Sequence, residues 1–374
     1  MNLVGNTTLA FSEEQAMLMD VAREFCRDKS PIAEVRDQLE TETGFDAALW
    51  QELVGLGWAG IALPESVGGS GLGVGALVPV VEAMGRAMLG TPLINTSLAA
   101  QLILRTGNTE QVERLLAPIV EGSIATPALL DNGDWGADGL ALTLGDDGVL
   151  SGSKRFVGDA AVADTVVASA SRGGAPVLVV VTADQLSGKL RPCTLIDQTK
   201  RAADIDFSGV QVSPENIIGG DKVADALRDV RLFGALLVAA EATGSAAACL
   251  DTVVEYLNTR KQFGKLIGSY QALKHPTVDI LTSMEDSRSF VYHAASLVGE
   301  ESLDRDAELA CRMAKAKASE TLAYAGDRAV QFHGGMGFTY ECDAQLYIRR
   351  AQWTQQAFGD VQHHRKRLAS LLLD

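Results

Sequence analysis

A glycine-rich stretch near the C-terminal end of the chain has the composition of a ligand-binding loop. Residues 331–341 read QFHGGMGFTYE, with two adjacent glycines at Gly334 and Gly335. Glycine lets a backbone approach a ligand closely and adopts conformations that other residues avoid. Gln331 and His333 place polar side chains beside that open backbone. Taken alone, the stretch would also fit a helix end followed by a turn.

A second group of candidate binding residues lies at 259–272, where the chain reads TRKQFGKLIGSYQA. Arg260 carries a planar guanidinium that is always charged and can form two parallel hydrogen bonds, which suits a diphosphate. Phe263 could add an apolar contact. Arg260 by itself would equally fit a solvated charge at a helix end.

The elements that must position these residues fall into three blocks. Apolar residues at helical spacing predict an early helix that starts at a capping box of Ser12 and Gln15, and further helices at 46–56, 76–88, 93–105 and 109–120, with a loop at 60–75. Alternating and β-branched segments then predict strands at 140–144, 165–169, 177–181 and 203–207. Long amphipathic segments predict helices at 223–260, 270–298, 307–333 and 344–373.

This order of elements predicts an α+β fold with three domains. We expect an N-terminal helical domain at 1–122, a small antiparallel β domain at 123–222 and a C-terminal four-helix bundle at 223–374. A chain of 374 residues is too long for one simple core, and 47% hydrophobic with 21% charged residues is a globular composition.

One motif in the N-terminal block is misleading. Residues 71–76 fit the G-x-G-x-x-A fingerprint of dinucleotide-binding folds. No alternating strand–helix–strand pattern surrounds it, and the region near Gly90 has no acidic residue to bind a ribose. We therefore interpret 71–76 as part of a connection between two helices.

Charge and cysteine usage exclude several classes of partner. The net charge of −16 argues against nucleic acid and anionic membranes, which need clustered lysine and arginine. Five dispersed cysteines suit a reducing cytoplasm and are expected to be small buried residues, and their spacing to the five histidines predicts no metal site. Residues 1–11 show no signal-peptide pattern, and no apolar stretch is long enough to span a bilayer, so we expect a cytoplasmic protein.

Several segments, taken in order, resemble the acyl-CoA dehydrogenase family of flavoproteins. They are PESVGGSG at 64–71, LSGSK at 150–154, FSGVQV at 207–212, TRKQFGK at 259–265, QFHGGMGF at 331–338 and RRA at 349–351. The resemblance covers nearly the whole chain. The family's order of helices, strands and helices agrees with the three blocks predicted independently.

The resemblance implies FAD as the cofactor and an acyl-CoA thioester as the substrate. The family oxidises the Cα–Cβ bond to a 2-enoyl-CoA: a carboxylate removes the α proton and the flavin takes the β hydride. It also implies a homo- or hetero-oligomer, arranged as a dimer of dimers, and an electron-transferring flavoprotein as acceptor. Each FAD lies between two subunits, one supplying the ring contacts and the base, the other the pyrophosphate and adenosine contacts.

The residues of the neighbour-facing half of that site are present. Arg260 matches the pyrophosphate contact and Phe263 an apolar contact, whereas Gln331 and the backbone of the glycine loop match the adenosine and pyrophosphate contacts. The full set of cofactor-binding residues that the resemblance assigns is Arg260, Phe263, Gln271, Gln331, Gly334, Gly335, Phe156 and Gln362.

The half that would face the chemistry matches poorly. Residues 129–138 read LLDNGDWGAD, where the family usually carries a Thr-Glu-Pro-Gly type of loop over the flavin. Phe156-Val157-Gly158 replaces the family's Trp-Ile-Thr strand. Phe156 can serve as the aromatic wall, but Gly158 cannot supply the threonine hydroxyl.

The catalytic base is the larger gap. Counting from Arg349, Phe358 falls on the position of the family's catalytic glutamate. Counting back from Arg260, Gly234 falls on the second known location of the base. Neither residue can accept a proton. A shift of two residues in the first count would bring in Asp360.

Two carboxylates remain as candidate bases. Asp360 lies two residues past Phe358, where it could act as a base or hold a structural place at the flavin edge. Glu241 interrupts an apolar run two helical turns beyond Gly234, about 10 Å along the helix. Burial raises the pKa of a carboxyl group, as a base near neutral pH requires. Glu241 could instead form hydrogen bonds inside the bundle and fix the register of its helix.

Three functions are compatible with this pattern. The chain could be an active acyl-CoA dehydrogenase that uses Asp360 or Glu241. It could be the silent subunit of a heteromeric enzyme, such as those that resemble this family in the bacterial breakdown of steroid side chains. It could also be a family member without flavin, although Arg260 and the loop at 331–337 argue against that.

Overall fold

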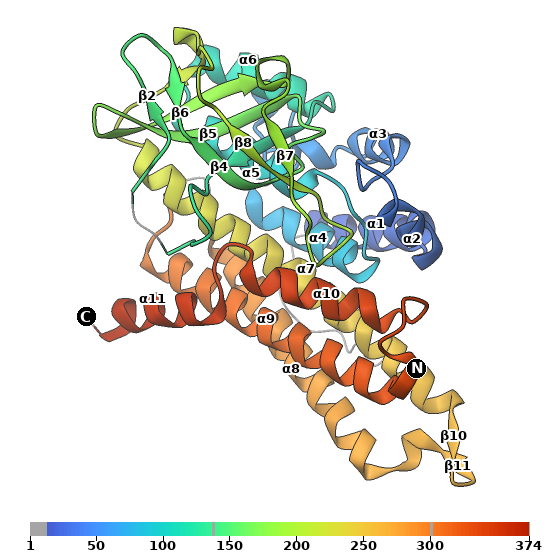
Figure 1. Cartoon of the computed structure of the whole chain (residues 1–374). Coiled ribbons are helices and arrows are strands. Elements are labelled where there is room, and N and C mark those ends of the chain that lie inside the picture. The colour runs from blue at the N-terminus through green and yellow to red at the C-terminus, as the bar shows by residue number, and fades with distance from the viewer. Residues whose placement is uncertain (1–12, 137–138, 300–301, 374) are drawn as a thin grey trace.

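Helices, strands and helices follow one another along the chain, as predicted (Figure 1). The computed structural model describes residues 13–136, 139–299 and 302–373. The N-terminal helices are α1 (Glu13–Lys29), α2 (Ile32–Leu39), α3 (Ala47–Gly55), α4 (Leu77–Arg86), α5 (Leu93–Thr106) and α6 (Thr109–Val120). The C-terminal helices are α7 (Val223–Thr259), α8 (Gln271–Leu297), α9 (Arg305–His333), α10 (Ala344–Gln356) and α11 (Val361–Leu373). The predicted fold class is confirmed.

Side-chain caps fix the starts of several helices. Asp46 accepts a hydrogen bond from the backbone of Ala48 at the start of α3, and Asn108 and Gln111 form a capping box at the start of α6. The predicted capping box at the first helix includes Ser12, which lies outside the described residues.

Two sheets form the middle block. One has the strand order β3-β2-β5-β6-β9 with β1 paired to β5, and the other has the order β4-β8-β7. The strands are β1 (Ala125–Ala128), β2 (Thr143–Leu144), β3 (Leu150–Ser151), β4 (Ser153–Gly158), β5 (Thr165–Arg172), β6 (Ala175–Thr182), β7 (Leu190–Pro192), β8 (Ala202–Asp206) and β9 (Ile217–Ile218).

The expectation of a purely antiparallel β domain needs correction. β1 and β2 both pair with β5 in the parallel direction. All four residues of β1 are buried, and β1 packs against α5, so it lies between the strands and the helices instead of at an exposed edge. Parallel pairing of this kind needs cover on both faces, and α5 provides part of it.

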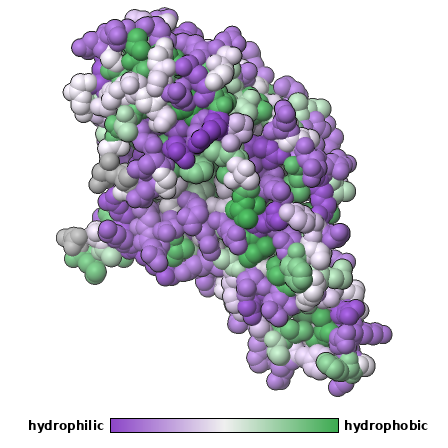
Figure 2. Space-filling view, viewed as in Figure 1, coloured by the Kyte–Doolittle hydropathy of each residue, from purple (hydrophilic) through white to green (hydrophobic). Residues whose placement is uncertain are grey.

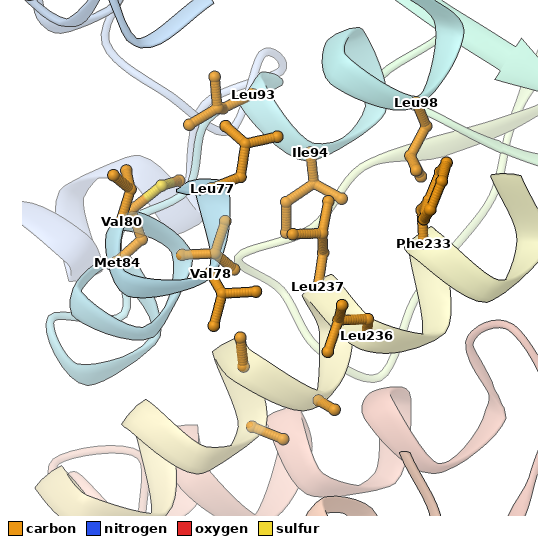
Figure 3. Packing of buried hydrophobic residues seen from close by; sticks show 14 of the residues in the cluster. Leu77, Val78, Val80, Met84, Leu93, Ile94, Leu98, Phe233, Leu236 and Leu237 are labelled. Carbon is orange, nitrogen blue, oxygen red and sulfur yellow. The ribbon is translucent and has the colours of Figure 1, made fainter. Parts of the chain in front are cut away.

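The helix α7 runs through the centre of the molecule, and α4 and α5 pack across it. Figure 3 shows Leu77 and Val78 of α4 and Ile94 of α5 facing Leu236 and Leu237 of α7. By length and composition α7 could cross a membrane, contrary to the sequence expectation. Of the apolar window in α7, 94% is buried inside the protein, as befits a core helix.

The predicted last helix is broken into two. α10 ends at Gln356, and α11 starts at Val361 after a short connection at 357–360. In that connection Phe358 has a φ of 57° and Gly359 a φ of 100°, a left-handed conformation that a helix cannot contain. Helices α10 and α11 therefore share the place expected for the fourth helix of the bundle, and the connection between them becomes part of a pocket wall.

Candidate active site and cofactor site

A pocket of about 500 Å³ lies between the middle strands and the C-terminal helices. We call it the inner pocket. Its walls come from α5, the end of β4, the segment 194–202, α7 and the α10–α11 connection, and they include Asn95, Phe156, Lys200, Val238, Trp353 and Phe358. Its size is typical of a small-molecule site. Among the described residues, Phe156 is the one predicted cofactor-binding residue in its walls.

The two positions where the resemblance places a base lie in direct contact. A Cβ added to Gly234 would lie only 2.3 Å from Cε1 of Phe358. The phenyl ring therefore occupies the space that any side chain at 234 would need. Trp135 covers the ring from another direction, with ring centroids 4.8 Å apart. An aromatic pair on a glycine thus stands where proton abstraction would be expected, and it has no group that can accept a proton.

Asn95 fills the space that Gly158 leaves open. A Cβ at 158 would meet Nδ2 of Asn95 at 2.5 Å, so a threonine could not fit there beside it. Nδ2 of Asn95 also donates a hydrogen bond of 2.7 Å to Oδ2 of Asp159. A polar group is therefore retained at this point of the pocket, but it comes from α5 instead of β4.

Asp159 is a pocket residue that the sequence analysis missed. Its side chain is half-buried, and burial raises its pKa to about 6. Asp159 lies in a left-handed conformation, with a φ of 54°. The only sequence signal was its place directly after the strand at 156–158, where an acidic residue next to an apolar wall could have been noted.

Asp360 lines the inner pocket and also caps a helix. Its Oδ1 accepts a hydrogen bond of 2.7 Å from the backbone N–H of His363 in the first turn of α11. One carboxylate oxygen is thus committed to the helix start. Nearby, burial lowers the pKa of Lys315 to about 7, and its Nζ donates to the carbonyls of Thr354 and Gly359. These bonds hold the connection at 357–360 in place.

Glu241 belongs to a buried ion network and not to the wall of the inner pocket. Its Oε1 accepts from Nη1 of Arg350 at 2.9 Å and from Nζ of Lys200 at 2.5 Å. The guanidinium of Arg350, which is fully buried, also pairs with Asp197. The network joins α7, α10 and the segment 194–202. This arrangement matches the structural alternative considered for Glu241, in which it fixes the register of its helix.

The remaining predicted FAD residues gather far from the inner pocket, apart from Gln362, which is exposed on α11. The strands β10 (Lys261–Gln262) and β11 (Lys265–Leu266) form a hairpin at the end of the C-terminal helices that lies away from the middle strands (Figure 1). Stacking of Tyr256 on His333, with centroids 4.1 Å apart, brings the end of α7 beside the glycine loop. Residues Arg260, Phe263, Gln271, Gln331, Gly334 and Gly335 are all exposed there.

This distal surface is open and partly apolar. Figure 2 shows hydrophobic residues gathered on the same arm of the molecule, where Phe263 is 89% exposed and Met336, Phe338 and Tyr340 are also exposed. Phe263 sits at the hairpin tip with a φ of 52°, a strained conformation for an aromatic residue. Such exposure and strain are typical of a surface that contacts another molecule.

The glycine loop and Arg260 have the features that a dinucleotide needs. Gly334 has a φ of 61°, and no atom of the described residues lies near the position of a Cβ at Gly334 or Gly335, so a ligand could approach the backbone. At position 337 a glycine is needed for a structural reason instead, because an added Cβ would lie 2.1 Å from the carbonyl oxygen of Val330. The guanidinium of Arg260 is exposed, and within the part of the chain that the structure describes it has no side-chain partner.

Cysteine and metal chemistry find no support among the described residues. Cys26, Cys249, Cys311 and Cys342 are buried as free thiols, and burial raises the pKa of Cys26 and of Cys311 to about 12. Cys193 is half-buried, and its thiol donates a hydrogen bond to the carboxylate of Asp204. Residues 13–136, 139–299 and 302–373 contain no group of three or more potential metal ligands.

Comparison with known proteins identifies the family. The acyl-CoA dehydrogenase N-terminal domain matches residues 12–123 and the C-terminal domain matches residues 232–373. "Acyl-CoA dehydrogenase IpdE2" of Mycolicibacterium smegmatis is 30% identical, over 96% of this chain and 98% of that protein. "Caffeyl-CoA reductase-Etf complex subunit CarC" of Acetobacterium woodii is 30% identical, over 91% and 93%.

A solved structure extends this similarity to three dimensions. It is a variant of the "Tcur3481-Tcur3483 steroid ACAD", with a TM-score of 0.86 and 29% identity, and the match covers 96% of this chain and 98% of that one. The chain therefore belongs to the acyl-CoA dehydrogenase family, whose cofactor is FAD.

Proposed function

We propose that this chain is the subunit of a heteromeric acyl-CoA dehydrogenase that completes an FAD site on a catalytic homologue and does not itself abstract the proton. One observation carries the proposal: the ring of Phe358 lies on Gly234, so both positions for the base are occupied by groups without basicity. The distal surface with Arg260 and the glycine loop retains the features of the other half of the site.

The chain's own residues would act on the cofactor of the neighbouring subunit. Arg260 would neutralise the pyrophosphate, because its exposed guanidinium has no side-chain partner in residues 13–136, 139–299 and 302–373 and could form paired hydrogen bonds. The open backbone at Gly334 and Gly335 would admit the dinucleotide, and Phe263 would pack against it. Bound FAD would supply the hydride acceptor. The apolar residues of the distal surface would be covered by the partner subunit.

The names of related proteins favour a heteromer. The solved steroid ACAD has a name that joins two components, Tcur3481 and Tcur3483. A partner that supplies the base would account for the loss of the base in this chain. By the same analogy, we propose a steroid-derived or other lipid acyl-CoA as the substrate class, and an electron-transferring flavoprotein as the acceptor.

A second function has a specific observation in its favour. Asp360 and Asp159 both line the inner pocket, so one of them could act as the base if this chain binds substrate itself. The commitment of one Asp360 oxygen to α11 and the bond from Asn95 to Asp159 make both carboxylates less available.

Flavin stoichiometry distinguishes the two functions. The chain would be purified alone and after co-expression with homologues encoded beside it, and bound FAD would be measured by absorbance. We expect little flavin on the chain alone and about one FAD per pair of subunits in the complex. Full FAD occupancy of the chain alone, together with dye reduction by an acyl-CoA, would contradict the proposal.

A further inference from the structure

A second cavity, which we call the outer cavity, lies on the other side of Phe358. It measures about 490 Å³ and is walled by α7, α9, α11 and residues near 140 and 176. Its charged lining residues are Arg228, Arg231, Arg312, Arg367 and Glu308, with His363 and His364 alongside. Arg228 pairs with Asp229, and Arg312 pairs with Glu308, so part of this charge is compensated. Among the described residues that line the cavity, four arginines stand against one carboxylate, so the lining is net positive even with these pairs formed and favours an anionic ligand, in a chain whose net charge is −16.

Among the described residues, three line both cavities: Phe358, Trp135 and His363. They therefore lie between the inner pocket, whose walls are mainly aromatic and apolar but include Lys200, Asp159 and Asp360, and the outer cavity, which is basic. A CoA thioester has an anionic head and an apolar acyl group. A thioester whose head occupies the outer cavity would need to pass Phe358 to place its acyl group in the inner pocket.

The phenyl ring of Phe358 is held in place from several sides. It contacts Gly234 on α7 and stacks on Trp135. Its own carbonyl accepts a hydrogen bond from Nε2 of His364, and the next carbonyl, of Gly359, accepts from Nζ of Lys315. His364 and Lys315 are both buried. These bonds fix the backbone at 358–359, and the ring itself is confined by its contacts with Gly234 and Trp135.

We propose that Phe358, seated on Gly234 and backed by Trp135, is a partition that excludes the acyl group of CoA thioesters from this chain's inner pocket while the outer cavity still accepts their anionic head. The inference rests on the proposed function and deepens it: this subunit lacks a base and is also closed to the acyl group. Phe358 is then the residue that determines which ligands the pocket admits.

Chain-length dependence of binding tests the partition. Isothermal titration of the purified full-length chain would compare free CoA, butyryl-CoA and octanoyl-CoA. A methylene that enters an apolar pocket strengthens binding by about fourfold, so four methylenes would give on the order of a hundredfold. We expect the wild-type chain to bind all three ligands with dissociation constants within about threefold of one another, because the acyl group stays outside.

Two variants, each lacking one aromatic ring of the partition, should let the acyl group enter the inner pocket. In Phe358→Ala and in Trp135→Ala, octanoyl-CoA should bind at least about thirtyfold more tightly than butyryl-CoA, whereas free CoA should bind as in the wild type. Circular dichroism checks that each variant is folded, and Trp135→Ala decides the matter if Phe358→Ala does not fold. Val278→Ala is the control, because Val278 is exposed on α8 and is not among the lining residues of either cavity; it should bind as the wild type does.

Three outcomes would overturn the proposal. They are a wild-type preference for octanoyl-CoA above tenfold, no length dependence in either folded variant, or no binding of free CoA to the wild-type chain. The flavin measurement is independent of all three. A wild-type chain that binds FAD fully by itself, while its affinity for thioesters does not depend on acyl length, would refute the proposed function and leave the partition standing.

Discussion

The phenyl ring of Phe358 rests on Gly234, and it can lie there only because residue 234 has no side chain. A Cβ at 234 would lie 2.3, 2.5 and 2.6 Å from three atoms of the ring, closer than any van der Waals contact. The two positions where a base would be expected are therefore in packing contact, and neither carries a carboxylate.

Gly234→Ala should destabilise the protein by about 1–3 kcal/mol, because the new methyl group overpacks the contact with the ring. An alanine inside a helix normally stabilises it by up to about 1 kcal/mol relative to glycine. In a Phe358→Ala background the clash is gone, so Gly234→Ala should become neutral or stabilising. Chemical denaturation of the four proteins in this double-mutant cycle would measure the coupling.

The control for this cycle is Gly55→Ala. Gly55 ends α3, and no atom in the part of the chain that the structure describes lies within 4 Å of an added Cβ. That substitution should leave stability unchanged or raise it slightly. Additive effects at 234 and 358 would show that the two residues do not depend on each other.

Glu241→Gln should lower stability by on the order of 3 kcal/mol. The substitution removes the negative charge that Arg350 and Lys200 share in a fully buried network, and a buried charge without its partner is costly. Thermal and chemical denaturation would measure the loss.

The matched control is Glu320→Gln, which breaks an exposed pair with Arg365 and should cost less than about 1 kcal/mol. If Glu241→Gln kept full stability but abolished turnover in the assembled enzyme, Glu241 would be a base and our structural assignment would fail.

Arg260→Ala should remove FAD from the heteromeric complex while leaving each subunit folded. The guanidinium is exposed and has no side-chain partner among the described residues, so its loss should not affect the fold. Lys265→Ala, on the neighbouring strand β11, removes an exposed cation of the same hairpin and serves as the control. FAD content per subunit, measured after gel filtration, gives the result. Equal FAD retention in Arg260→Ala and Lys265→Ala would contradict the predicted role of Arg260.

How far the sequence could predict this structure depends on the range of the interactions. Helix periodicity is local, so α6 was predicted at its observed bounds and α7 within one residue. The parallel pairing of β1 with β5 depends on α5 covering that strand, which no local pattern encodes. The break at 357–360 was missed because apolar spacing continues across it, and phenylalanine does not signal a left-handed conformation.

The residues of the candidate site differ in the same way: some could be identified from local sequence, and others depend on contacts between distant segments. Arg260 and the glycine loop could be found from sequence because contiguous motifs carry them. Asn95 could not, because its role depends on the space beside Gly158, which is far away in the chain. Glu241 stood out as a charge in an apolar run, but its partners Arg350 and Lys200 come from other elements. Spacing along one helix therefore could not distinguish a base from an ion pair.

Asp159 should make stability depend on pH between about 4 and 6. Its pKa is raised by burial to about 6 in the folded protein and is about 4 in an unfolded chain. The folded state therefore holds the proton more tightly. The contribution of protonated Asp159 to the free energy of unfolding is therefore complete below about pH 4, and it is lost as the pH rises through about 6.

Asp159→Asn should remove this dependence and retain the bond from Nδ2 of Asn95, since an amide oxygen also accepts it. Asparagine also tolerates the left-handed backbone at this position. Relative to the wild type, the variant should gain on the order of 1–3 kcal/mol between about pH 4 and pH 7, measured by urea denaturation. A constant difference across that range would show that Asp159 does not titrate there.

Exchanging the groups at 95 and 158 tests whether Asn95 has taken the place of the family's threonine. Gly158→Thr alone should destabilise the protein and weaken any ligand binding in the inner pocket, because its Cβ would lie 2.5 Å from Nδ2 of Asn95. Asn95→Gly alone should leave a gap beside Gly158 and remove the hydrogen bond to Asp159. The double variant Asn95→Gly/Gly158→Thr restores both the volume and a hydroxyl, so it should be more stable than Gly158→Thr alone by about 1–3 kcal/mol. Denaturation of the three variants measures this coupling. If the stability change of the double variant equals the sum of the two single changes, the two side chains do not compete for one space.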